Sequence, residues 1–137
     1  MTTIEGSCKC GGVHFRYTGK IGTVTVCHCA DCRKLQGGAG VVAAPVASAG
    51  MAWSGGRELI TEFESSPGKQ RAFCRRCGTP LYSRRVDAPE MLRLRMGCID
   101  SATAVVPVAH IFCHDVPAWA SLDDDLPRYP RHEPGRG

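Results

Sequence analysis

Cysteine spacing is the feature that most restricts how this chain can fold. The chain has nine cysteines, and all but two of them fall into three short clusters, Cys8/Cys10, Cys27/Cys29/Cys32 and Cys74/Cys77. A turn that holds two closely spaced cysteines aims both sulfurs at one point, as in structural zinc sites. Two pairs supply four thiolates and complete a tetrahedral site, whereas a triplet leaves one metal position for water or a substrate. The spacing therefore predicts one structural and one reactive metal site.

The two cysteine pairs are expected to share one structural zinc ion, whose ligands would be Cys8, Cys10, Cys74 and Cys77. Glycines follow both pairs, at Gly11-Gly12 and Gly78, and allow the positive φ or close backbone approach of a zinc knuckle. A shared ion would close a long loop and stabilise a small β domain. Disulfides or four buried thiols are the alternative. We expect a cytoplasmic protein with reduced thiols, because the first residues show no charged or apolar signal segment.

The triplet Cys27, Cys29 and Cys32 follows a strand expected at residues 23–26 and is predicted to hold a second zinc ion. Zinc with an open position lowers the pKa of an incoming thiol and presents it as a thiolate. His28 lies between two ligands, so we expect a spacer rather than a proton shuttle. Cys98, or a histidine near His110, could instead close the site and make it structural. Cys98 and Cys113 are better interpreted as small core residues.

The rest of the pattern predicts one mainly β domain over residues 1–126 and a tail at residues 127–137 rich in Pro, Gly and Arg. Apolar residues alternate with polar ones over residues 13–17 and 92–98, which is the period of half-buried strands. Sixteen glycines and nine prolines break the chain at short intervals, as an all-β chain requires. The only helix expected is a short one at residues 31–36.

Charge gives weaker indications of partners. The formal net charge is +4, but no basic block is interleaved with aromatic residues, so nucleic-acid binding has little support. The longest weakly apolar run, residues 39–52, is broken by Pro45 and too short to cross a membrane. Arg33 and Lys34 follow the triplet and could meet an anionic substrate, or they could be solvated surface charges. Arg71 is a third candidate for steering carboxylates.

The cysteine motifs and their flanking residues resemble the glutathione-dependent formaldehyde-activating family, which includes centromere protein V-like proteins. The resemblance runs from about Gly6 to Pro130. It is carried by Gly6-Ser7-Cys8-Lys9-Cys10-Gly11-Gly12, Cys27-His28-Cys29-Ala30-Asp31-Cys32-Arg33-Lys34, Phe73-Cys74-Arg75-Arg76-Cys77-Gly78-Thr79-Pro80 and Pro107-Val108-Ala109-His110-Ile111.

This resemblance implies several small coiled antiparallel β-sheets, of the β-tent type, which two zinc ions per chain stabilise. It assigns the four-cysteine set to the structural zinc and Cys27, Cys29 and Cys32 to the second zinc, near the thiol site. The implied reaction joins formaldehyde to glutathione, which is the reverse of a carbon–sulfur lyase reaction. Two other functions stay open: a non-catalytic zinc domain that binds a thiol or a protein partner, and a zinc or redox reservoir. The oligomeric state is not predicted.

Overall fold

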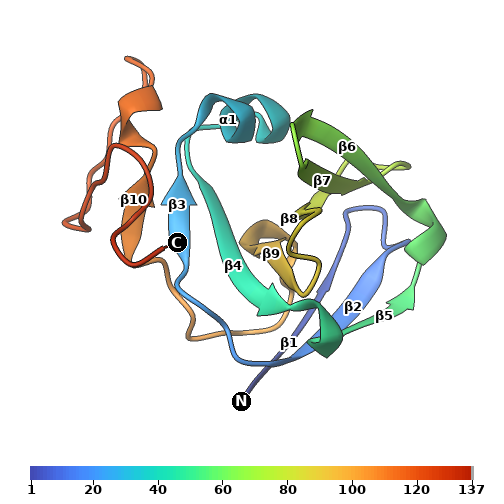
Figure 1. Cartoon of the computed structure of the whole chain (residues 1–137). Coiled ribbons are helices and arrows are strands. Elements are labelled where there is room, and N and C mark those ends of the chain that lie inside the picture. Colours follow the sequence, from blue (N-terminus) through green and yellow to red (C-terminus); the bar gives the residue numbers. More distant parts are fainter. Residues whose placement is uncertain (137) are drawn as a thin grey trace. The chain divides into compact units, whose positions relative to one another are not determined.

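The computed structural model describes residues 1–136, and Gly137, the last residue of the expected tail, lies outside the described residues. Contacts between residues divide the chain into two compact units. The first unit comprises residues 1–22 and 44–104, and the second comprises residues 23–43 and the chain from residue 105 onward. Strands dominate the chain and the helices are short, as Figure 1 shows, which confirms the mainly β prediction.

The first unit contains a three-stranded antiparallel sheet in the order β1-β2-β5. Its strands are β1 (Thr2–Ser7), β2 (His14–Gly19) and β5 (Met51–Gly55). Phe15 and Tyr17 of β2 are buried, whereas His14 and Arg16 are exposed. This alternation confirms the strand expected at residues 13–17 from its two-residue period.

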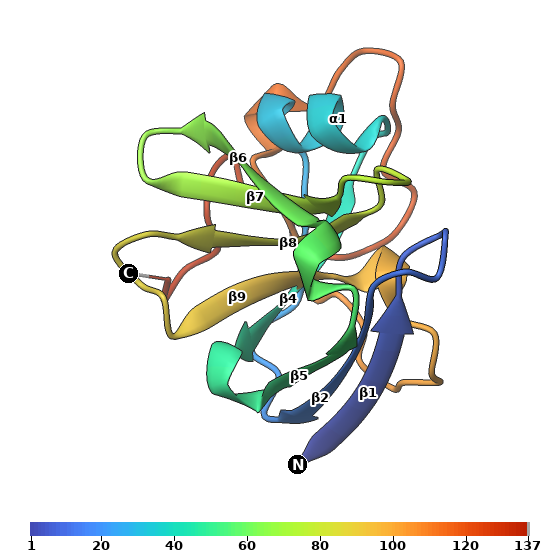
Figure 2. The ribbon, with the colours of Figure 1, turned by 90° about the vertical axis from the view of Figure 1, so that its right-hand side faces the viewer.

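A second run of antiparallel strands lies in the order β9-β8-β7-β6 and forms successive hairpins, which Figure 2 shows from the side. The strands are β6 (Ile60–Ser66), β7 (Lys69–Cys74), β8 (Pro80–Arg85) and β9 (Met91–Arg95). Gly68 has φ of 77° in the turn between β6 and β7, a conformation that favours glycine. β9 ends at Arg95 and a 3₁₀ helix follows at Met96–Cys98, so the strand expected to reach residue 98 is three residues shorter.

The core of the first unit is apolar and includes Ile4, Val13, Tyr17, Leu81 and Leu94. Cys98 belongs to this core with only 2% of its surface exposed, as its apolar neighbours in sequence predicted. Burial raises the pKa of the Cys98 thiol to about 12. Cys98 is therefore an inert, protonated core residue near neutral pH.

The described part of the second unit is built on three strands and one α-helix. They are β3 (Thr25–Cys27), the start of β4 (Val41–Ala47), β10 (Ala109–Ile111) and α1 (Ala30–Gln36). β3 pairs antiparallel with β4 and parallel with β10. The helix ends at Gly37, which has φ of 76° and donates its N–H to the Arg33 carbonyl as a C-cap. Helix α1 confirms the short helix expected at residues 31–36.

The remaining short helices are 3₁₀ turns at Ser48–Gly50, Arg57–Leu59 and Cys113–Asp115. The last of them begins at Cys113, two residues after β10 ends at Ile111. No helix in the described chain, residues 1–136, is long and apolar enough to cross a membrane.

The chain after residue 126 lies along β10 for several residues. The His110 N–H donates to the Pro127 carbonyl (2.9 Å), and the Tyr129 N–H donates to the His110 carbonyl (3.0 Å). The Phe112 N–H donates to the Arg131 carbonyl (3.0 Å). These backbone hydrogen bonds involve the first residues of the expected tail. The boundary at residue 126 stays a prediction.

Candidate metal centres

The structure brings the four paired cysteines of the first unit together. The Sγ atoms of Cys8, Cys10, Cys74 and Cys77 all lie within 4.8 Å of one another. The Cys8 and Cys10 sulfurs are 3.5 Å apart, and those of Cys10 and Cys74 are 3.9 Å apart. Tetrahedral zinc with Zn–S bonds of about 2.3 Å holds its sulfurs about 3.8 Å apart. The donor set and its spacing therefore fit one zinc ion, and all nine cysteines are free thiols.

Both ends of this site are tight turns that depend on glycine. Gly11 has φ of 77° and Gly78 has φ of 81°, both in the left-handed region. The Gly11 N–H donates to the Cys8 carbonyl (3.0 Å) and the Gly78 N–H donates to the Cys74 carbonyl (2.7 Å). Each turn folds back after its first cysteine, which allows the second sulfur to face the first.

Hydrogen-bond donors surround the sulfurs of the four-cysteine site. The Val13 N–H donates to Cys8 Sγ (3.2 Å), and Arg76 Nε donates to Cys10 Sγ (3.3 Å). The Thr79 hydroxyl lies 3.2 Å from Cys77 Sγ. Hydrogen bonds, first from Thr79, lower the pKa of Cys77 to about 5. Donors of this kind favour the thiolate form, which is the form that binds metal.

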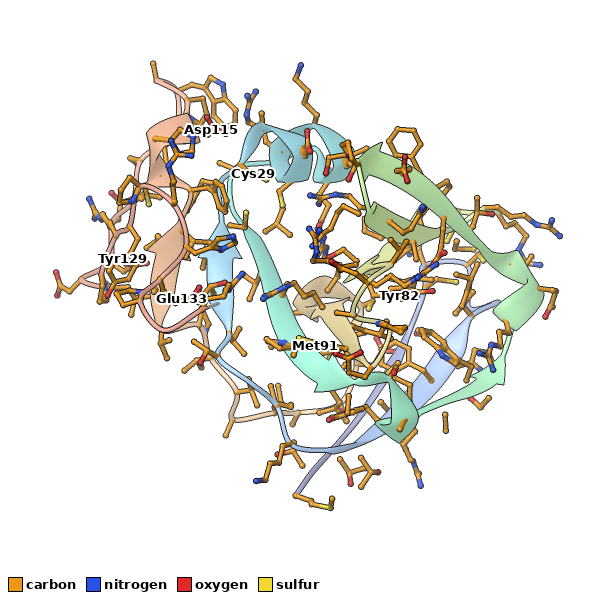
Figure 3. The ribbon with its side chains drawn as sticks, viewed as in Figure 1. Cys29, Tyr82, Met91, Asp115, Tyr129 and Glu133 are labelled. Atoms are coloured by element: carbon orange, nitrogen blue, oxygen red, sulfur yellow. The ribbon has the colours of Figure 1, made fainter. Side chains whose placement is uncertain are left out.

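The triplet of the second unit is assembled by the end of β3 and the start of α1. Cys27 is the last residue of β3, Cys29 is the N-cap of α1, and Cys32 lies in its first turn. The three Sγ atoms lie within 4.8 Å of one another. The Cys32 N–H donates to Cys29 Sγ (3.3 Å), so one sulfur both caps the helix and faces its neighbours. Figure 3 labels Cys29 at the start of this helix.

The three neighbouring thiol groups of the triplet are suited to binding a cation. The side chains of Cys29 and Cys32, together with burial, raise the pKa of Cys27. Three thiolates this close repel one another, and a bound cation removes that repulsion. Within the described part of the second unit, the metal-capable group at this position contains three residues and no histidine or carboxylate.

A series of hydrogen bonds begins at His28, the residue between Cys27 and Cys29, and runs through buried His110 to exposed Asp124. His28 Nε2 lies 2.8 Å from His110 Nδ1, and His110 Nε2 lies 2.9 Å from Asp124 Oδ2. His28 is 3% exposed and His110 is 4% exposed. The hydrogen bond from His110 is the main cause that lowers the pKa of Asp124, so that group is a carboxylate.

The Asp124 carboxylate determines which atoms donate and which accept in this series of hydrogen bonds. Asp124 can only accept, so His110 Nε2 carries a proton, and with both imidazole rings neutral His110 Nδ1 accepts from His28 Nε2–H. His28 Nδ1 is then unprotonated, and this buried atom has no hydrogen-bond partner among residues 1–136. Burial, and secondly His110, lowers the pKa of His28, which keeps the ring neutral. His28 therefore anchors the segment between Cys27 and Cys29 to β10.

The sequence led us to interpret His28 as a spacer and to consider a histidine near His110 as a ligand that could close the second site, and it gave no indication of Asp124. Asp124 is the middle residue of an acidic run with no spacing relation to the cysteines. A further anchor was missed in the same way: Asp115 Oδ2 accepts from the N–H of Ala30, the first residue of α1 (3.1 Å). Figure 3 labels Asp115 beyond β10.

The candidate substrate residues fall in different units. Arg33 and Lys34 lie in the last turn of α1, directly after Cys32. Arg33 is half-buried and Lys34 is exposed. Arg71 lies in β7 of the first unit, where its Nε donates to Ser65 Oγ (2.9 Å).

The fold and these sites define a class of protein: a mainly β chain with two separate cysteine clusters, each able to hold a metal ion. The chain belongs to the glutathione-dependent formaldehyde-activating enzyme family, because residues 3–115 match the model of that family. A relative from Halomonas elongata, provisionally named as a glutathione-dependent formaldehyde-activating enzyme, is 30% identical over 128 residues. That match covers 88% of this chain and 81% of the relative.

A solved structure supports the fold independently. The crystal structure of a Rhodobacter sphaeroides protein aligns with a TM-score of 0.61 at 21% sequence identity. The alignment covers 74% of this chain and 92% of the other. The match of residues 3–115 to the family model confirms the family predicted from the cysteine motifs.

Proposed function

We propose that this protein is a zinc-dependent carbon–sulfur lyase that acts on glutathione, or another thiol, and formaldehyde or a related aldehyde adduct. In the direction of adduct formation, which is the reverse of the lyase reaction, the thiol sulfur forms a bond to the carbonyl carbon of formaldehyde. The thiol proton passes to the carbonyl oxygen, and the product is the S-hydroxymethyl adduct of the thiol. Family membership and the assembled triplet of Cys27, Cys29 and Cys32 support this proposal.

The triplet is the observation that carries the proposal. A bound zinc ion would supply Lewis acidity that lowers the pKa of a thiol at neutral pH. The residues of the chain hold the three sulfurs in place: α1 fixes Cys29 and Cys32, and the His28–His110–Asp124 hydrogen bonds fix the segment before them. Arg33 and Lys34 place positive charge next to the triplet in sequence, which favours an anionic thiol such as glutathione.

The four-cysteine site has a structural role in this proposal. Its ligands come from positions far apart in the chain, and Cys8 and Cys74 are buried. A zinc ion there would cross-link β1 and β7 without exposing a metal position, because four thiolates complete a tetrahedral site. The free state of all nine cysteines supports a reducing compartment, and we propose the cytoplasm.

Paired substitutions with a metal count test the two roles. We expect Cys74→Ser to abolish folding, and Cys29→Ser to leave a folded protein that retains one zinc ion but has lost thiol binding. Exchange spectroscopy by NMR on glutathione plus formaldehyde, with and without protein, then measures turnover. Wild-type protein should raise the exchange rate above spontaneous addition, and Cys29→Ser should not.

Two results would contradict the proposal. If Cys29→Ser unfolds the domain as severely as Cys74→Ser, the triplet is structural. If the wild-type protein with both sites loaded gives no rate increase, the protein is a binding module for thiols or a partner.

A further inference from the structure

Cys29 is the middle ligand of the triplet, and both of its neighbours in the chain are held by side chains from the later part of the second unit. Before Cys29, His28 Nε2 lies 2.8 Å from His110 Nδ1. After Cys29, the Ala30 N–H donates to Asp115 Oδ2 (3.1 Å). The backbone on each side of this ligand is therefore fixed by contacts that span 82 and 85 residues of sequence.

The first of these anchors continues through Asp124 to Arg128. Asp124 Oδ2 lies 2.9 Å from His110 Nε2 and so orients the imidazole ring that holds His28. Arg128 Nη2 donates to the Leu122 carbonyl (2.7 Å) and to the Asp124 carbonyl (3.1 Å). One guanidinium group thus holds the exposed turn around Asp124 in the conformation in which its carboxylate faces His110.

The second anchor also depends on the end of the chain. Residues 127–131, which we call the C-terminal segment, lie along β10, and Figure 1 shows this part of the chain in red. The Cys113 N–H donates to the Tyr129 carbonyl (3.0 Å). Phe112 has φ of 55° directly before the 3₁₀ helix that carries Asp115. Because such a conformation persists only where its surroundings hold it, the C-terminal segment helps to fix the turn from which Asp115 reaches α1.

We propose that Asp115, Asp124 and Arg128 are positioning residues for a metal ion at the triplet, and that the C-terminal segment is part of this site. Cys29 lies at the junction between β3 and α1, where its direction depends on both anchors. Ligands that are already in place bind a metal ion more tightly, because less ordering is needed on binding. The inference rests on the proposed function in one respect, the presence of a metal ion at the triplet.

The three positioning residues act through the backbone and are not ligands themselves. Within residues 1–136, the metal-capable group at this position contains only the three cysteines. Substitution of a positioning residue should therefore change how tightly the ion is bound and leave the number of sulfur ligands the same. A general loss of structure would instead affect the four-cysteine site as well.

Cadmium-113 NMR and competition with a zinc chelator measure metal binding at the two sites without any thiol substrate. An ion bound by four sulfurs and an ion bound by three give separate cadmium signals, so the four-cysteine site is a reference within the same molecule. The variants are Asp124→Ala, Asp115→Ala and Arg128→Gln in the full chain. Asp125→Ala is the matched control, because Asp125 is exposed beside Asp124 and its loss removes the same charge.

We expect Asp124→Ala and Asp115→Ala each to raise the metal Kd of the triplet about tenfold, the loss typical when a residue that orients a metal ligand is removed. Arg128→Gln should raise this Kd by a smaller factor. Asp115→Asn should restore binding close to that of the wild-type protein, because asparagine keeps an acceptor oxygen for the Ala30 N–H. Asp125→Ala should leave the Kd of the triplet unchanged, and the Kd of the four-cysteine site should be the same in every variant.

Three results would overturn the inference. The first is a wild-type Kd at the triplet in Asp124→Ala or Asp115→Ala. The second is Asp115→Asn weakening the triplet as much as Asp115→Ala does. The third is an equal loss of affinity at both metal sites. Arg128 is exposed, so Arg128→Gln decides the question by an unchanged or a raised Kd if an aspartate variant fails to fold.

These outcomes are separate from those of the proposed reaction. If the wild-type protein binds two metal ions, the variants weaken the triplet, and no protein accelerates formaldehyde exchange, the reaction is wrong and the positioning role stands. If the wild-type protein accelerates exchange but the variants bind metal at the triplet as tightly as it does, the positioning role alone is wrong.

Discussion

Loss of metal from the four-cysteine site should destabilise this protein more than loss of metal from the triplet. Cys10 and Cys74 are 64 residues apart in sequence and their sulfurs are 3.9 Å apart. A cross-link that closes a loop of this length removes unfolded-state entropy worth about 4 kcal/mol at 25 °C. The triplet lies within one short segment, Cys27 to Cys32, and the same relation gives only about 2 kcal/mol there.

That difference is large compared with the stability of a domain. Free energies of unfolding are typically about 5–15 kcal/mol, so loss of the long-range cross-link removes a substantial fraction. In urea, with an m-value of about 2 kcal/mol/M, the unfolding midpoint should fall by about 2 M for the four-cysteine site and about 1 M for the triplet.

Urea titrations of Cys10→Ser and Cys29→Ser under reducing conditions measure the two effects. Cys10 is exposed, so serine at that position adds no buried polar group, unlike serine at the fully buried Cys74. Fluorescence of Trp53 reports the first unit because its ring lies 5.4 Å from Phe15, and a Trp119→Phe background removes the other tryptophan. Wild-type protein stripped of metal by a chelator gives the combined effect.

The reasoning fails if Cys29→Ser lowers the midpoint as much as Cys10→Ser does. It also fails if metal-free wild-type protein unfolds at the same urea concentration as the loaded protein, because no metal cross-link then contributes to stability.

Two further perturbations test side-chain interactions away from the metals. His110→Ala should lower the free energy of unfolding by about 1–3 kcal/mol, because it leaves the buried His28 Nε2–H without an acceptor, and urea denaturation measures this loss. Arg84 holds the pKa of Glu62 below its ordinary value, so this group stabilises the fold above the unfolded pKa and the stability is lost as pH falls through the lower folded pKa. Glu62→Gln should therefore lower the free energy of unfolding by about 1 kcal/mol at pH 7 and make it depend less on pH below about pH 4.5. Glu5→Gln, at an exposed ion pair, should change neither quantity. If Glu62→Gln loses stability in acid as steeply as the wild-type protein does, this assignment is wrong.

Local chemistry made the cysteine sites visible in the sequence. Cys8 with Cys10, and Cys74 with Cys77, lie close enough in sequence for a single turn to aim each pair, and the glycines that follow permit the turns. Helix α1 was visible for the same reason: a short polar segment is followed by Gly37, which serves as its C-cap.

The shortening of β9 shows a limit of periodicity. Apolar residues alternate through Cys98, yet the backbone turns into a 3₁₀ helix after Arg95. Cys98 is nevertheless buried in the core, as a strand through residue 98 would also have placed it. A period of two therefore identified the buried side chain but not the backbone that carries it, because burial depends on the direction of the side chain and not on strand hydrogen bonds.

The sequence by itself determined the family, the mainly β character and the two cysteine clusters, because these depend on residue types at short spacing. Only the tertiary structure decided that His110 bridges His28 and Asp124, and that Ser83 lies between Arg71 and Arg93. The first depends on contacts across 82 and 14 residues, and the second on strand register, which a bulge between Ala72 and Phe73 shifts. A shift of one residue would turn each side chain to the other face of the sheet, and no local pattern in the sequence specifies it.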